Sequence, residues 1–69
     1  VNTKKLKGMI AEKGTTAGNL AENIGINPST FSNKMKSGKF TIEEADNIVK
    51  ALELTSDEAT AIFFSQFVA

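Results

Sequence analysis

Three polar side chains that can form hydrogen bonds with an external partner lie close together in the segment 28–36: Ser29, Ser32 and Asn33. A serine hydroxyl can donate and accept, and an asparagine amide offers both functions side by side. At about 100° per residue these residues share one side of a helix. Phe31 and Met35, four residues apart, form a narrow apolar stripe on the other side. We therefore expect a helix that buries one stripe and presents a polar face.

The segment before this helix is expected to form a second short helix that crosses it. Leu20 and Ile24 lie four residues apart and stack on one helix face. Ala21 is small enough to allow a close crossing, and Ile26 is expected to fill the gap between the two helices. Gly25 lies between them, where a glycine can adopt the left-handed conformation that reverses the chain.

Local capping signals place the ends of these two helices. Thr16 is the expected cap of the first helix. Asn27 caps the second, and Pro28 suits the first helical position because its missing amide hydrogen would have no partner there. Gly38 is expected to end the second helix. The sequence thus predicts two helices joined by a tight turn, over about residues 16–38.

Three further helices complete the predicted fold. A first helix capped by Asn2 or Thr3 is expected to run to about Lys13. The segments 41–44 and 55–58 both have the Thr-x-x-Glu pattern of a capping box, and each opens a helix. The expected core positions of the fourth helix are Ile42, Ala45, Ile48, Val49 and Leu52. We predict an all-α fold, a compact five-helix bundle in a single domain over residues 1–69.

This order of features resembles the helix-turn-helix of the lambdoid-phage repressor and Cro family. The resemblance rests on Leu20-Ala21, Ile24-Gly25-Ile26, Thr30-Phe31 and Ser37-Gly38-Lys39, and on the following FTIEEADNIVKAL segment. It covers most of the chain to about Leu54. It implies a sequence-specific regulator of transcription that binds double-stranded DNA, of the small phage repressor type. In such a protein the helix 28–36 would lie in the major groove.

The resemblance and the residue types together define the expected contacts. Base edges would be read from the polar face, where Asn33 can pair with an adenine edge. The expected base-reading residues are Pro28, Ser29, Ser32 and Asn33. Lysines, hydroxyls and nearby backbone amides would contact phosphates. The expected phosphate-binding residues are Thr15, Thr16, Lys34, Lys36, Ser37 and Lys39.

Two positions depart from the family pattern. The family often has a glutamine at the start of the first motif helix, where this chain has Ala17. The position three after Phe31 is usually apolar in the family, but here it is Lys34. Either the second helix is slightly rotated, or the stem of Lys34 lies along the core and its ammonium group lies outside.

The charge is distributed unevenly although its total is zero. Residues 1–42 contain seven lysines against Glu12 and Glu22, a net charge of +5, while residues 43–69 carry −5. No acidic residue lies between Asn23 and Ile42. Such a polarised chain can orient on a polyanion. Ordinary solvated faces with a chance asymmetry are the alternative.

Composition argues against several other classes. There is no histidine and no cysteine, so the commonest general base and the commonest metal ligands are missing. We expect no enzyme, no metal site and no cofactor, and no small-molecule ligand is evident. Three acids at 43, 44 and 46 suit the dipole of a helix N-terminus better than a metal site. No apolar run approaches the ~18 residues of a membrane span, and a cytoplasmic protein is expected.

The last predicted helix, at about 56–68, is apolar around more of its circumference than a surface helix requires. We therefore expect it to form a homodimer contact, through Phe64, Phe67 and Val68. The alternative is that Phe63 and Phe67 fill the core and Phe64 is merely exposed. The same helix supports a competing function, in which the chain is a small helical protein-interaction module that binds no DNA.

Overall fold

Each helix begins at a residue whose side chain caps its N-terminus. The computed structural model describes residues 1–64. Over this range the helices are α1 (Thr3–Glu12), α2 (Ala17–Asn23), α3 (Pro28–Ser37), α4 (Ile42–Leu52) and α5 (Ser56–Phe63). The side-chain oxygens of the capping residues accept backbone hydrogen bonds of 2.8 to 3.1 Å. These caps are Asn2, Thr16, Asn27, Thr41 and Thr55. The predicted helix starts are therefore confirmed.

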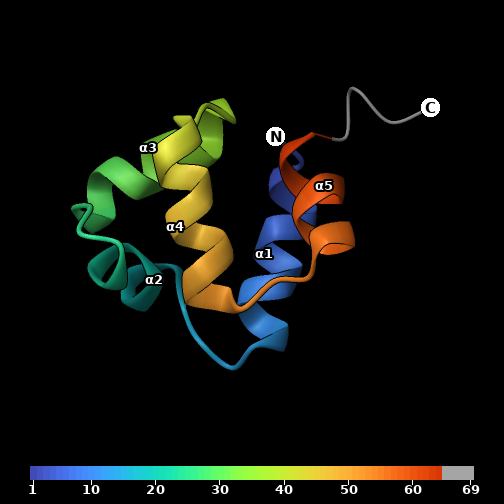
Figure 1. Cartoon of the computed structure of the whole chain (residues 1–69). Helices are drawn as coiled ribbons and strands as arrows, with labels where there is room; N and C mark the ends of the chain where they lie inside the picture. The colour runs from blue at the N-terminus through green and yellow to red at the C-terminus, as the bar shows by residue number, and fades with distance from the viewer. Residues whose placement is uncertain (65–69) are drawn as a thin grey trace.

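The five helices form a compact all-α globule, and residues 1–64 contain no strand. In Figure 1, α4 runs between α2 and α3 on one side and α1 and α5 on the other. The radius of gyration is 10.9 Å, close to the roughly 11 Å expected for a folded chain of this length. No helix in this part of the chain is long and apolar enough to cross a membrane.

One core joins all five helices. Its most deeply buried large side chains are Leu6, Leu20, Phe31, Ile48 and Ile62, one from each helix. The ring of Phe40, in the loop after α3, lies 5.6 Å from that of Phe31 and 6.4 Å from that of Phe63. These aromatic rings connect α3 to α5 through the loop, in the tilted and edge-to-face geometries that aromatic pairs favour.

A glycine follows each of the helices α2 and α3 at the point where the helix ends. Gly25 has a φ of +77° and reverses the chain after α2. Gly38 has a φ of +72°, and its amide donates to the carbonyl of Lys34 at the end of α3. A side chain at either position would be strained, because L-residues rarely adopt this left-handed backbone. Ala21 is fully buried, and Ile26 packs partly buried against the core. The two helices therefore meet at a corner rather than forming one rod.

The expected core position at Ile42 is wrong. Its side chain is 86% exposed, while Ile48 and Leu52 on the same helix are buried. Helical spacing places Ile42 on the correct face of α4. However, it is the first residue of the helix, and no element within residues 1–64 covers its side chain.

The fifth helix is shorter than the predicted range of 56–68. It ends at Phe63, and Phe64 follows as its C-cap with a non-helical φ of −126°. The carbonyl of Ile62 accepts a 2.7 Å hydrogen bond from the amide of Asn2. The N-terminus of the chain thus binds the last turn of α5. The remaining residues of the predicted range, including Phe67 and Val68, lie outside the described residues.

Candidate nucleic-acid interface

The outward face of α3 carries the polar side chains that the sequence singled out. Ser29, Ser32 and Asn33 are all exposed. The hydrogen bonds found within residues 1–64 leave these three side chains without an intramolecular partner. Pro28 is also exposed, at the first position of the helix. The side chains of Ser29, Ser32 and Asn33 are therefore free to form hydrogen bonds with an external molecule, while Pro28 offers only an apolar contact.

The opposite face of α3 fixes the helix on the rest of the molecule. Phe31 is 1% exposed and Met35 is buried with it. The side chain of Asn27 and the turn at Gly25 set where α3 begins relative to α2. Because the buried stripe holds the helix in one rotational position, the exposed polar side chains have a defined direction.

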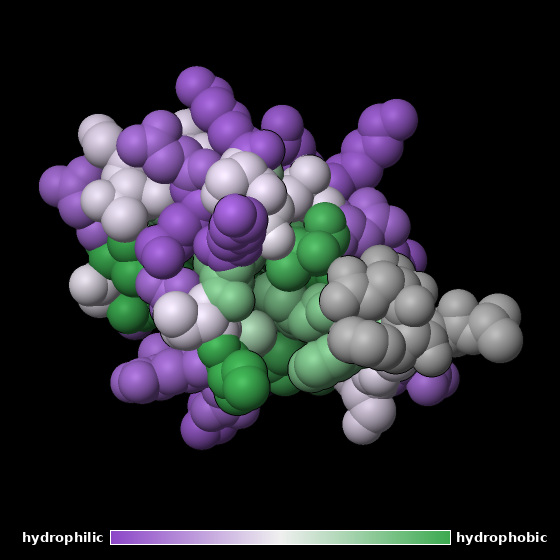
Figure 2. Space-filling view, turned by 90° about the horizontal axis from the view of Figure 1, so that it is seen from above, coloured by the Kyte–Doolittle hydropathy of each residue, from purple (hydrophilic) through white to green (hydrophobic). Residues whose placement is uncertain are grey.

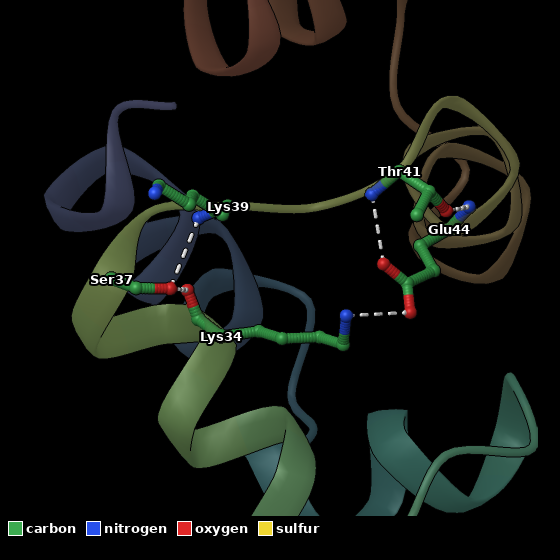
Figure 3. A network of polar contacts seen from close by, with 5 residues as sticks. All are labelled: Lys34, Ser37, Lys39, Thr41 and Glu44. Carbon is green, nitrogen blue, oxygen red and sulfur yellow. Dashed lines mark hydrogen bonds and ion pairs between the residues drawn. The ribbon is translucent and has the colours of Figure 1, made fainter.

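The expected phosphate-binding residues have different environments. Lys36 and Lys39 are exposed. The hydroxyl of Ser37 donates to the carbonyl of Lys34 at 3.2 Å and accepts from the amide of Lys39 at 3.4 Å. Ser37 thus orders the end of α3, as Figure 3 shows. A phosphate contact by its hydroxyl would have to share or replace these bonds.

The two threonines before α2 are engaged locally. Thr16 is exposed, and its hydroxyl oxygen accepts from the amide of Asn19 at 3.1 Å. Thr15 is half-buried, and its amide donates to the carbonyl of Ile10. The Thr16 hydroxyl retains its own hydrogen as a donor.

Lys34 is drawn toward α4. Its ammonium group lies 3.1 Å from Oε2 of Glu44, and the two side chains are 28% and 19% exposed. The sequence left two alternatives for this lysine: a slightly rotated helix, or a stem along the core with the ammonium group outside. In the structure the side chain is half-buried, and the ammonium group contacts an acid instead of open solvent. Sequence reasoning assigned Glu44 to the capping box and to the acidic first turn of the helix, and it missed the contact with Lys34. The two residues are ten apart and lie on different helices, so neither helical nor strand spacing indicates this pair.

Glu44 and Glu58 have carboxyl groups that are stabilised in the charged form. The Thr41 amide donates to Glu44 at 2.8 Å and, with the Lys34 ammonium, lowers the pKa of Glu44 below the ordinary value of 4.5. The Thr55 amide donates to Glu58 at 2.8 Å and lowers its pKa in the same way. A carboxyl group whose pKa is lower in the folded state contributes stability above its unfolded pKa, and that stability is lost as the pH falls through the folded pKa.

We therefore expect acid to destabilise the protein as the pH falls below about 4.5. The double variant Glu44→Gln, Glu58→Gln should lose less thermal stability between pH 7 and pH 3 than the unaltered chain does. Thermal unfolding followed by circular dichroism at the two pH values measures this. Glu43→Gln is the control, because Glu43 lies in the same turn but takes no part in a capping bond. An equal loss of stability in the double variant and the unaltered chain would contradict the expectation.

A small apolar groove lies at the N-terminal end of α4. Its volume is about 260 Å³, and its apolar lining includes Phe40, Ile42, Ala45, Val49, Phe63 and Phe64. Ile42 and Phe64 are the large hydrophobic side chains that the described residues expose most, at 86% and 50%. Figure 2, which looks down on this end, shows hydrophobic surface on this face of the molecule.

Comparisons with models of known protein families, with curated proteins and with solved structures found no match to this chain. The function is therefore inferred from the arrangement of its own residues.

Proposed function

We propose that the chain binds double-stranded DNA in a sequence-specific way and acts as a small transcriptional regulator of the repressor type. In this proposal α2, the turn at Gly25 and α3 are a helix-turn-helix, and α3 enters the major groove. The observation that carries it is the exposed row of Ser29, Ser32 and Asn33, on a helix whose opposite face is buried. Short side chains on a fixed helix let the backbone approach base edges closely.

The residue types suggest how the bases would be read. The Asn33 amide can pair with the N6 and N7 edge of an adenine, and the two serines can donate to or accept from several bases. Pro28, in the first turn of α3, would lie with the N-terminal part of the helix against the base edges. The chain contains no arginine, so it lacks the side chain that reads guanine with two bonds. We expect modest discrimination by each subunit.

Phosphate contacts would come from the groups that flank α3. Lys36 and Lys39 are exposed, and residues 24–41 contain no acid. Thr15, Thr16 and Ser37 lie at helix ends, where amides and hydroxyls can bond to phosphate oxygens. Residues 1–42 carry a net charge of +5 despite Glu12 and Glu22, and residues 43–69 carry −5. This asymmetry favours one orientation on DNA.

We further propose that the protein binds DNA as a homodimer through the region around Phe64. This side chain is half exposed and borders the apolar groove. Phe67 and Val68, the other expected contacts, lie outside the described residues. A two-fold dimer would place its two α3 helices in major grooves about 34 Å apart.

Selection of binding sites from random duplexes, performed at two salt concentrations, tests the proposal. We expect enrichment of one sequence, and an inverted repeat if the dimer binds as proposed. Affinity for the selected site should fall as salt rises, because lysine contacts release counterions from the DNA. No enrichment, together with no retention of duplex at low salt, would overturn the proposal.

The apolar groove favours a second candidate function, a protein-interaction module that does not bind DNA. Phe64→Asp discriminates between the two functions. If the chain self-associates or binds a protein through this surface alone, the substitution should abolish that interaction, and no duplex should be retained by the unaltered chain. If the chain is a dimeric DNA-binding protein, the unaltered chain retains duplex, and the substitution weakens binding by separating the subunits.

A further inference from the structure

The ion pair between Lys34 and Glu44 is the one polar side-chain contact that joins two helices within residues 1–64. Every side-chain hydrogen bond in this range connects residues no more than four apart. The other ion pair, Asp46 with Lys50, lies within α4. Figure 3 shows the Lys34 side chain extending from α3 across to Glu44 on α4.

This pair is better shielded from water than the other one. Its side chains are 28% and 19% exposed, against 74% and 57% for Lys50 and Asp46. Partial burial reduces the screening of a charge pair by solvent and salt. The Glu44 carboxylate is also held from two sides, because Oε1 accepts from the Thr41 amide while Oε2 faces Lys34. The capping bond and the ion pair thus together hold the carboxylate.

Lys34 also differs from the other lysines near α3. It shares a helix face with the buried Phe31, three residues earlier, and it is half-buried, while Lys36 and Lys39 are exposed. Its positive charge is therefore directed at α4. An ammonium group that is paired with an acid cannot replace a counterion on DNA without first giving up that partner.

We propose that Glu44 is a positioning residue of the DNA interface, which ties α3 to α4 and withholds the Lys34 ammonium from DNA phosphates. The inference rests on the proposed function and adds a restraint to it. Non-specific attraction is kept low, because one lysine of the basic region is neutralised within the molecule. A larger share of the binding free energy then comes from the base-reading side chains. Lys34, expected from the sequence to bind phosphate, serves instead to hold α3.

Glu44→Gln tests this restraint. Glutamine can keep the capping bond, because its side-chain oxygen also accepts from the Thr41 amide. It removes the negative charge that faces Lys34. We expect binding to a duplex of unselected sequence to tighten by about 5- to 10-fold at 0.1 M salt, and the salt slope to steepen by about 0.9, the value of one added phosphate contact. The ratio of specific to non-specific affinity should fall.

Asp46→Asn is the matched control, since it removes one acid from the same helix and breaks an ion pair that does not involve α3. It changes the net charge by the same amount and should leave the salt slope unchanged. Lys34→Gln is the second variant. By itself, Lys34→Gln should give nearly the same salt slope as the unaltered chain. Combined with Glu44→Gln, it should cancel the increase in affinity and salt slope that Glu44→Gln alone produces.

The outcomes separate the two proposals. If the unaltered chain binds DNA but Glu44→Gln and Asp46→Asn have the same slope, the restraint is overturned and the proposed function stands. A slope that falls by about 0.9 in Lys34→Gln alone would also overturn it, because Lys34 would then already contact a phosphate. If the unaltered chain retains no duplex at any salt concentration, both proposals are overturned.

Discussion

Phe31→Ala is expected to lower the free energy of unfolding by about 3–5 kcal/mol. The Phe31 side chain is 1% exposed and packs against the ring of Phe40, so its removal leaves a cavity between α3 and the loop that follows. A chain of this length has a total stability of about 3–10 kcal/mol. The variant should therefore lose a large fraction of its stability, and at the lower end of that range it should be unfolded at 25 °C. Urea denaturation followed by circular dichroism measures the loss.

Ile42→Ala provides the control for that experiment. It also shortens a large apolar side chain, but Ile42 is 86% exposed, so the change in stability should stay within about 0.5 kcal/mol. A comparable loss in the two variants would mean that the groove end of α4 is covered in solution, as a dimer contact there would require. A loss below about 1 kcal/mol for Phe31→Ala would contradict the packing of α3 described above.

Asn33→Ala is expected to cost about 1–3 kcal/mol of binding to the selected DNA site and to leave the stability of the fold unchanged. The amide is exposed and without an intramolecular partner among the described residues, so the folded state loses no contact. On DNA the substitution would leave an adenine edge without the two hydrogen bonds that the Asn33 amide provides. Gel retardation with the selected duplex and with a duplex altered at one base pair measures the effect.

Lys36→Ala serves as the comparison for Asn33→Ala. Lys36 lies on the same exposed face, and as a phosphate contact its loss should weaken binding to all sequences and reduce the salt slope by about 1. Asn33→Ala should instead weaken binding mainly to the selected site. If it weakened binding to all duplexes equally, Asn33 would be a backbone contact and the base-reading role would fall.

Features that depend on a few neighbouring residues could be predicted from the sequence. The capping oxygens of Asn27, Thr41 and Thr55 bond to amides two or three residues away, and the turn at Gly25 needs only a residue that tolerates positive φ. The exposed face of α3 follows from the same local logic, because a helix that buries Phe31 and Met35 must turn Ser32 and Asn33 outward.

Features that depend on which elements meet in space were decided by the tertiary structure. Helical spacing placed Ile42 on the core face of α4, but its exposure depends on how the other elements of residues 1–64 pack around the first turn of that helix. Lys34 and Glu44 are ten residues apart on different helices, and their contact depends on the packing between those helices. The physical reason is the distance along the chain over which each interaction acts. Caps and turns are set by bonds within one turn of helix, whereas burial and ion pairs between helices are set by neighbours that folding supplies.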